Sequence, residues 1–249
     1  MAKLLFLQNI QYEFVGPTYI SAMLKRAGHD CKVVFGNSLV NFEETIEDYK
    51  PDIVGFSIMS PTAAWANEVG AQIKNKYGLP TIFGGAHSTF YPEYIKNEGV
   101  DILVRGEGED VALEVMNCIE DKKDFGNIGN LIYKKNGSVI ENRIRNLRTD
   151  LDAYPFPDRK LYEPEFRKHN MDLSVRHVIT SRGCPFSCTF CQAVTMRQMY
   201  KGKGNYLRIR KIDKVLEELE LLKNTTETRS LYFVDDTFGL DFAWLKDFL

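Results

Sequence analysis

The chain has 249 residues, of which 44% are hydrophobic and 27% are charged, a composition typical of a folded globular protein and not of a disordered one. Its 32 basic and 34 acidic residues give a formal net charge of -2, which indicates neither a nucleic-acid-binding surface nor a polybasic membrane anchor. The apolar runs are short and interrupted, so we expect no transmembrane helix and no secretory signal, and we predict a cytoplasmic protein.

The first half of the chain alternates short apolar runs with segments of helical periodicity. Buried strands are predicted at residues 3–7, 31–35, 53–59, 81–83 and 102–104. Helices are predicted at residues 17–27, 42–49, 63–76, 91–97 and 110–120. Strands that are each followed by a helix indicate an α/β fold with a doubly wound parallel sheet. Ligands of such sheets bind outside the carboxyl ends of the strands.

The loops at these carboxyl ends are rich in Gly, Ser and Thr, which lets a ligand approach the backbone closely. They are predicted at residues 8–16, 57–62, 84–89 and 105–109. No G-x-G-x-x-G opens a helix after the first strand, and the chain has no P-loop. The sequence therefore predicts a ligand-binding edge without a dinucleotide or nucleoside-triphosphate motif.

A hairpin is predicted at residues 131–140, where Asn136-Gly137 separates two short runs of strand character. A stretch rich in Pro and Tyr follows it and is typical of a linker. We therefore place a first domain at residues 1–128, and the hairpin with a Pro-rich linker at residues 129–172.

Residues 173–249 have the element order that begins a βα barrel. The predicted elements are a strand at residues 176–180, a helix at 212–223, a strand at 231–234 and the start of a helix at 242–249. A barrel cannot close with so few strands. This predicts a chain that is truncated within the barrel.

The strongest local signal is a C-x3-C-x2-C motif. Its cysteines are Cys184, Cys188 and Cys191. This spacing is compatible with one face of a helix, but Gly183 and Pro185 favour a loop curled around a ligand. Three thiolates suit an iron–sulfur cluster, whereas structural zinc needs a fourth ligand, for which His177 is a candidate. Two arginines beyond the motif, Arg208 and Arg210, could meet a carboxylate, but solvated surface is the default expectation for them.

The C-x3-C-x-Phe-C form of this motif, placed after a strand, resembles the radical S-adenosylmethionine (SAM) superfamily. A wider set of stretches resembles, in order, the radical SAM family that has a B12-binding domain. The stretches are residues 52–57, 84–89, 105–109, 151–155, 180–184 and 233–236. The resemblance implies a Rossmann-like, cobalamin-binding-like first domain followed by the start of a partial βα barrel.

The resemblance also implies cofactors and site residues. The three cysteines of the motif would hold a [4Fe–4S] cluster whose open iron binds SAM, and reductive cleavage of SAM would give a 5′-deoxyadenosyl radical. The residues implied near SAM are Phe190, Asp235 and Asp236. The residues implied near cobalamin are Glu13, Ser57, Ser60, Thr62, Gly84, Gly85, His87, Gly106 and Glu107. Structural roles compete with several of these: turn capping for the Ser and Thr residues, helix capping for the two aspartates and loop hydrogen bonding for the histidine.

One departure concerns cobalt. Cobalamin-dependent mutases carry D-x-H-x-x-G after the first strand, with the His as cobalt ligand, and residues 11–16 occupy this place here. Gln11 and Glu13 replace the Asp and the His, so we expect cobalamin without a protein histidine ligand.

The implied function is that of a radical SAM enzyme that transfers a methyl group or carries out another radical transformation of a small molecule. The implied partners are that unidentified substrate and an electron donor such as flavodoxin or ferredoxin, with no nucleic acid and no membrane. Three alternatives stay open: a cofactor-binding fragment without activity, a radical SAM protein that does not bind cobalamin, and a zinc-stabilised α/β protein without redox chemistry.

Overall fold

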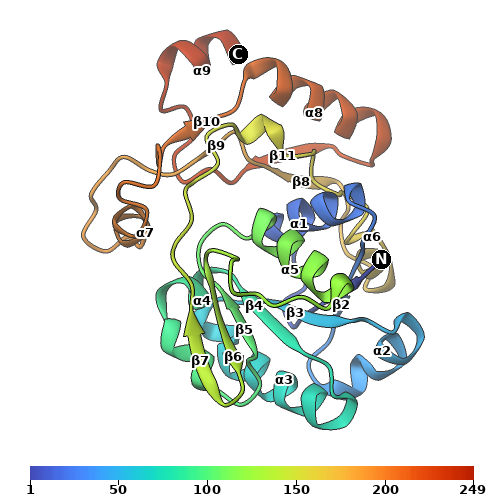
Figure 1. The fold of residues 1–249 in the computed structure, drawn as a ribbon. Coiled ribbons are helices and arrows are strands. Elements are labelled where there is room, and N and C mark those ends of the chain that lie inside the picture. Colours follow the sequence, from blue (N-terminus) through green and yellow to red (C-terminus); the bar gives the residue numbers. More distant parts are fainter. The chain divides into compact units, whose positions relative to one another are not determined.

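The computed structural model covers residues 1–249 and divides into two compact units (Figure 1). The first unit comprises residues 1–145 and 157–165, and the second comprises residues 146–156 and 166–249. The chain passes for the last time from the first unit to the second within α6 (Glu163–Lys168). None of the helices is both long enough and apolar enough to cross a bilayer.

A seven-stranded sheet in the order β2-β1-β3-β4-β5-β6-β7 forms the centre of the first unit. Its strands are β1 (Lys3–Gln8), β2 (Asp30–Phe35), β3 (Ile53–Ser57), β4 (Thr81–Gly84), β5 (Ile102–Val104), β6 (Leu131–Lys135) and β7 (Ser138–Glu141). The first five strands pair in parallel, with Leu4 opposite Cys31 of β2 on one side and Ile53 of β3 on the other. This confirms the parallel α/β sheet predicted from the sequence.

Helices cover both faces of this sheet, as in a doubly wound fold (Figure 1). They are α1 (Val15–Arg26), α2 (Glu43–Tyr49), α3 (Ala63–Tyr77), α4 (Ala86–Phe90) and α5 (Glu109–Asp121). Short 3-10 helices occur at η1 (Leu39–Asn41), η2 (Ser60–Thr62) and η3 (Pro92–Lys96). α1 packs with α5 on one face, and α2 and α3 cover the other. Under α3 the rings of Phe56 and Phe83 stack with centroids 4.6 Å apart, and both are fully buried.

The structure differs from the sequence prediction in several places of this unit, and the strand predicted at residues 53–59 ends at Ser57. Residues 86–90, expected within a loop, form α4, and the helix expected at 91–97 is the 3-10 helix η3. The hairpin β6–β7, expected in a linker, pairs antiparallel with β5 and extends the sheet. A bare edge strand exposes a row of unpaired backbone N–H and C=O groups, and the hairpin satisfies those of β5.

Part of the expected linker also packs into the first unit. Tyr162 donates a hydrogen bond from its hydroxyl to Gln8 Oε1 at 2.9 Å, and the Glu165 carboxylate accepts one from the Phe35 N–H at 2.7 Å. Polar contacts of this kind anchor residues 157–165 beside β1 and β2. The first unit is therefore larger than residues 1–128.

The second unit contains two short sheets. Its elements are η4 (Leu151–Ala153), β8 (Val175–Val178), β9 (Ser181–Arg182), α7 (Ala193–Met199), β10 (Arg208–Ile209), α8 (Ile212–Thr225), β11 (Ser230–Phe233) and α9 (Phe242–Phe248). β8 and β11 pair in parallel, and β9 and β10 pair antiparallel. The succession β8, α8, β11 is the crossover that parallel neighbours require, and it agrees with the expected start of a βα barrel.

Two helical glycines allow a matched test of this packing. An added Cβ on Gly70 of α3 would lie 2.6 Å from the Gly99 carbonyl oxygen, whereas one on Gly16 of α1 would meet no atom within 4 Å. Overpacking typically costs about 1–3 kcal/mol, against about 1 kcal/mol of helix propensity gained over glycine. We expect Gly70→Ala to lower the free energy of unfolding in urea by up to about 2 kcal/mol, and Gly16→Ala to leave it unchanged or raise it. Equal effects of both substitutions would contradict the close approach of α3 to Gly99.

Candidate functional site

The candidate site of the first unit is the carboxyl edge of its sheet. β1, β3, β4 and β5 are parallel, so the loops that follow them leave from the same edge. From β1 the chain continues to β2 on one side, and from β3 it continues to β4 on the other. The place between β1 and β3 is therefore the topological switch point, where open α/β sheets bind their ligands.

The loops after β3 and β4 contact each other directly. The Ile58 N–H donates to the Gly84 carbonyl oxygen at 2.9 Å, and the His87 N–H donates to the Ile58 carbonyl oxygen at 3.2 Å. Gly85 has φ +94°, and a Cβ there would lie 2.6 Å from the Ile58 carbonyl oxygen, so only glycine suits this position. Gly84 differs, because an added Cβ would meet nothing within 4 Å. A ligand can therefore reach the backbone at Gly84.

His87 is a titratable side chain at this edge. Its Nδ1 is hydrogen-bonded to Ser60 Oγ at 3.0 Å, and its ring stacks on Tyr91 with centroids 4.7 Å apart. Burial lowers the pKa of His87, and the nearby Glu93 carboxylate opposes that shift. The neutral imidazole that results presents one donor and one acceptor nitrogen.

The loop after β5 is braced by α4. The Gly106 N–H donates to Thr89 Oγ1 at 2.9 Å, and the Thr89 hydroxyl donates to the Gly85 carbonyl oxygen at 2.9 Å. Gly106 has φ +78°, in the left-handed region that glycine favours. Gly106 and the half-buried Glu107 therefore lie in a loop that is tied to the loop after β4.

Other residues predicted to contact cobalamin are engaged by the protein itself. Thr62 is buried, and its hydroxyl caps its own turn by bonding the backbone of Met59 at 3.0 and 3.2 Å. Glu13 is 1% exposed and forms a buried ion pair with Arg159 at 3.7 Å. Ser57 is half-buried at the end of β3. The structure thus brings Ser60, the glycines and His87 together at the edge, but turns Thr62 and Glu13 into the protein.

The three cysteines of the motif lie between β9 and α7 in a segment that is not helical, which confirms the predicted loop. The loop begins at Gly183, whose φ is +90° and whose Cα approaches the Tyr206 carbonyl too closely to carry a side chain. Arg197 of α7 donates to the Pro185 carbonyl oxygen at 2.5 Å and to Ser187 Oγ at 2.8 Å. Cys184 Sγ lies 3.3 Å from Thr237 Oγ1. Sequence reasoning missed Arg197 and Thr237, because no spacing rule distinguishes them from surface residues.

The loop does not gather its thiols into a finished metal site. Cys188 is exposed, Cys184 and Cys191 are half-buried, and Phe190 is 92% exposed. No group of three or more His, Cys, Asp or Glu side chains in the chain is placed to hold a metal ion. His177, the candidate fourth zinc ligand, instead packs edge-on against Tyr232. The donor set is nevertheless right for iron–sulfur chemistry, and such loops take their final shape from the metal bonds themselves.

The two aspartates after β11 have different surroundings. The Asp235 carboxylate accepts from the Thr180 N–H at 3.0 Å, from the Thr180 hydroxyl at 2.7 Å and from the Ser181 hydroxyl at 2.5 Å. Asp236 is exposed. Neither caps the next helix, because Asp241 takes that position and accepts from the Trp244 N–H. Asp235 therefore holds the start of the cysteine loop, and Asp236 is the one open to a ligand.

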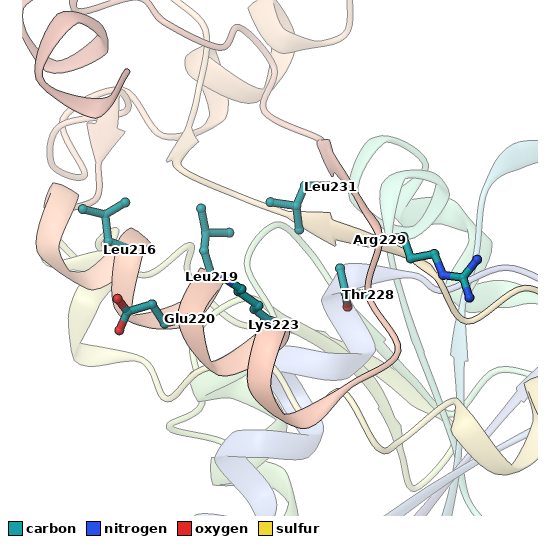
Figure 2. A pocket seen from close by; sticks show the side chains of 7 residues that line it. All are labelled: Leu216, Leu219, Glu220, Lys223, Thr228, Arg229 and Leu231. Carbon is teal, nitrogen blue, oxygen red and sulfur yellow. The ribbon is translucent and has the colours of Figure 1, made fainter.

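A groove of about 350 Å³ lies between α8 and β11 (Figure 2). Its lining residues are Leu216, Leu219, Glu220, Lys223, Thr228, Arg229 and Leu231. It is mainly apolar and contains none of the site residues predicted from the sequence.

Comparison with known proteins adds to this geometry. A family model for the B12 binding domain matches residues 12–116. An uncharacterized methyltransferase of Pyrococcus horikoshii is 31% identical over 91% of this chain and 49% of its own length. The anaerobic magnesium-protoporphyrin IX monomethyl ester cyclase of Rubrivivax gelatinosus is 32% identical over 82% of this chain and 38% of its own length. The chain spans about half the length, or less, of these relatives.

The solved structure of the radical SAM methyltransferase TsrM from Kitasatospora setae superposes with a TM-score of 0.76. It is 16% identical, and the match covers all of this chain and 50% of TsrM. The cobalamin-dependent SAM radical enzyme OxsB gives a TM-score of 0.74 at 18% identity, over 95% of this chain and 34% of OxsB. At these identities the likeness concerns the fold.

The protonation of His87 is open to direct measurement. Burial places its pKa below the ordinary value of 6.5. The folded state then binds this proton more weakly than the unfolded chain does. The contribution to stability is therefore present in full above pH 6.5 and declines as the pH falls from there towards the folded-state pKa. We expect an NMR titration of the imidazole protons, assigned with His87→Gln, to show a midpoint below 6.5. A midpoint at or above this value would contradict the half-buried, neutral ring.

Proposed function

We propose that the chain, which contains a B12-binding domain and is related to cobalamin-dependent radical SAM enzymes, binds two cofactors. Cobalamin would bind at the carboxyl edge of the sheet, and a [4Fe–4S] cluster would bind in the cysteine loop. The observation that supports cobalamin binding is that the candidate ligand-binding edge lies within the residues matched by the B12-binding model. The residues matched by the B12-binding model, 12–116, contain the switch point, the open backbone at Gly84 and the Ser60–His87 pair.

Cobalamin would lie against Gly84 and Gly85, with Ser60, His87 and the Gly106 loop as its polar neighbours. The position that supplies the cobalt ligand in mutases is Glu13 here, and its carboxylate is buried beside Arg159. A buried ion pair is costly to break, because each partner left alone keeps its desolvation penalty. We therefore propose that cobalamin binds without a protein histidine on cobalt, while the Glu13–Arg159 pair stabilises the loop that faces it.

The cluster would be held by Cys184, Cys188 and Cys191, with SAM near Phe190 and the exposed Asp236. When bound, the cluster supplies the electron that cleaves SAM reductively. The protein's part is to orient these groups: Gly183 permits the sharp entry into the loop, and Arg197 braces the stretch between the first two cysteines. Asp235 is not proposed as a SAM ligand, because its carboxylate is occupied by Thr180 and Ser181.

The proposed reaction class is methyl transfer, or another radical transformation, on a small molecule. The relatives named above are a methyltransferase and a cyclase, and both names fit this class. An electron donor such as flavodoxin or ferredoxin would reduce the cluster. Two alternatives are a protein that binds the cofactors without turnover and a radical SAM enzyme that does not bind cobalamin.

Gly84 offers a clean test of the cobalamin site. It is half-buried, and an added Cβ would meet no atom within 4 Å, so the side chain of Gly84→Val extends into the space proposed for the ligand. We expect the dissociation constant for hydroxocobalamin, measured by absorbance titration, to rise at least ~10-fold, a loss of roughly 1.4 kcal/mol. The thermal unfolding midpoint should stay near that of the wild type.

The matched control is Val139→Thr on the exposed hairpin strand β7, which should change neither quantity. Wild-type affinity in Gly84→Val would contradict the proposed site. If the wild-type protein takes up iron but does not bind cobalamin, the alternative of a radical SAM protein without cobalamin is supported instead.

The cysteine loop is tested by its metal content. After anaerobic reconstitution with iron and sulfide, we expect about four irons per chain in the wild type. Cys184→Ala, Cys188→Ala and Cys191→Ala should each lose most of this iron and its absorbance, because each removes one of three ligands. Cys118→Ala, a half-buried cysteine of α5 outside the loop, should retain it. A colourless preparation that contains zinc alone would favour the zinc-stabilised protein and overturn the cluster.

A further inference from the structure

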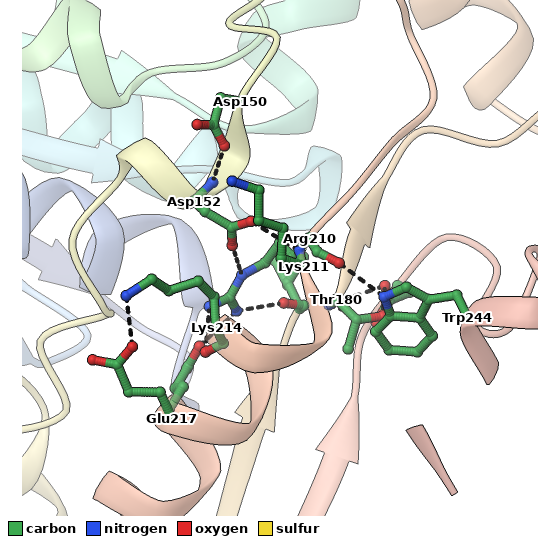
Figure 3. A network of polar contacts seen from close by, with 11 residues as sticks. Asp150, Asp152, Thr180, Arg210, Lys211, Lys214, Glu217 and Trp244 are labelled. Atoms are coloured by element: carbon green, nitrogen blue, oxygen red, sulfur yellow. Dashed lines mark hydrogen bonds and ion pairs between the residues drawn. The ribbon is translucent and has the colours of Figure 1, made fainter. Parts of the chain in front are cut away.

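A buried group of charges lies at the root of the cysteine loop (Figure 3). Arg208 and Arg210 are each only 4% exposed, so the default expectation of solvated surface is wrong for both, and Arg210 has the carboxylate partners that were the alternative. Its Nη1 forms an ion pair with Glu218 Oε2 at 2.6 Å, and its Nε forms one with Asp152 Oδ1 at 3.2 Å. Both carboxylates are themselves buried, so one guanidinium is shared between two acids inside the protein.

Arg210 also bonds the two residues that precede β9. Its Nη1 donates to the Ile179 carbonyl oxygen at 2.9 Å, and its backbone N–H donates to the Thr180 carbonyl oxygen at 2.8 Å. The Thr180 N–H in turn donates to Asp235. Thr180 is thus held on both sides, and four residues later the chain reaches Cys184.

Asp152 extends this group to the segment 146–156. Its second carboxylate oxygen accepts from the Lys211 N–H at 2.8 Å, which satisfies a free donor at the start of α8. The Trp244 indole N–H of α9 donates to the Arg210 carbonyl oxygen at 2.8 Å. A single arginine therefore joins four segments of the second unit (Figure 3).

Stability alone does not explain such a cluster. Burying ions carries a desolvation penalty, and well-packed apolar residues of similar volume often stabilise a protein as well or better. Charged side chains instead make directional hydrogen bonds. A guanidinium presents its donors in a rigid planar fork, which allows few alternative arrangements of its partners. The cluster is suited to hold the loop's root in one geometry.

We propose that Arg210, with Asp152 and Glu218, is a positioning residue that sets the direction in which the chain leaves β9 towards Cys184, and thereby the approach of the first thiol to the cluster. The functional part of this inference, placing Cys184 for the cluster, rests on the proposed function. The structural part, that Arg210 fixes the conformation of the residues before Cys184, can be tested without metal. This proposal also assigns a role to residues 151–155, which resemble the family but belong to neither proposed cofactor site.

The first readout is therefore made on protein without metal. Arg210→Lys keeps the charge and loses the fork. We expect hydrogen exchange at residues 180–182 to speed up by about tenfold or more, with the middle of α8 unchanged. The rate of Cys184 alkylation relative to Cys188 should shift as well. Asp152→Asn, which retains an oxygen for the Lys211 N–H, should act in the same direction with a smaller effect, and keeps the test decisive if Arg210→Lys folds poorly.

The matched control is Lys214→Gln, which removes an exposed ion pair with Glu217 on the same helix and should leave both rates unchanged. The second readout is the midpoint potential and EPR spectrum of the reconstituted cluster, which should shift in Arg210→Lys and not in the control. Exchange that is unchanged at residues 180–182, or raised uniformly over the second unit, would overturn the inference. A wild type that takes up no iron would refute the proposed function but leave the exchange result valid.

Discussion

The parallel pairing of β1 to β5 is the constraint on which the candidate cobalamin site depends. Parallel neighbours cannot be joined by a tight turn, so each connection crosses a face of the sheet through a helix and every strand ends at the same edge. Loops far apart in sequence, at Ser60, His87 and Gly106, are thereby brought to one edge. The helices bury both faces, which leaves this edge as the place where polar backbone can meet a ligand.

The cluster site proposed for the second unit has a different requirement, because a metal centre needs ligands that can close around it from a well-fixed framework. Its cysteine loop is open, with exposed Cys188 and Phe190, but the residues at its root are held by Asp235 and Arg210. A fixed entry with an adaptable loop suits a site whose last bonds are made by the metal. Arg197 adds a brace within the loop.

The buried ion pair of Glu13 and Arg159 gives the loop after β1 a structural role in the first unit. An imidazole at this place can ligate a metal as a neutral group. A carboxylate that is 1% exposed must instead be compensated by a cation, and Arg159 provides it from the segment that returns to the first unit. The loop after β1 is thus stabilised by a partner about 150 positions away.

Local pattern was enough for much of this protein. The apolar runs determined the parallel strands, because a strand buried on both faces must be apolar throughout. Gly183 and Pro185 determined that the cysteines lie in a loop, since both disfavour a continued helix. Long-range contacts decided the rest: the pairing of the hairpin with β5, the burial of Thr62 and Glu13, the use of Asp235 by Thr180, and the recruitment of Arg210 by Asp152 and Glu218. A sequence lists which side chains can form a hydrogen bond or an ion pair, but only the folded chain brings the partners within reach and removes the water that would otherwise compete.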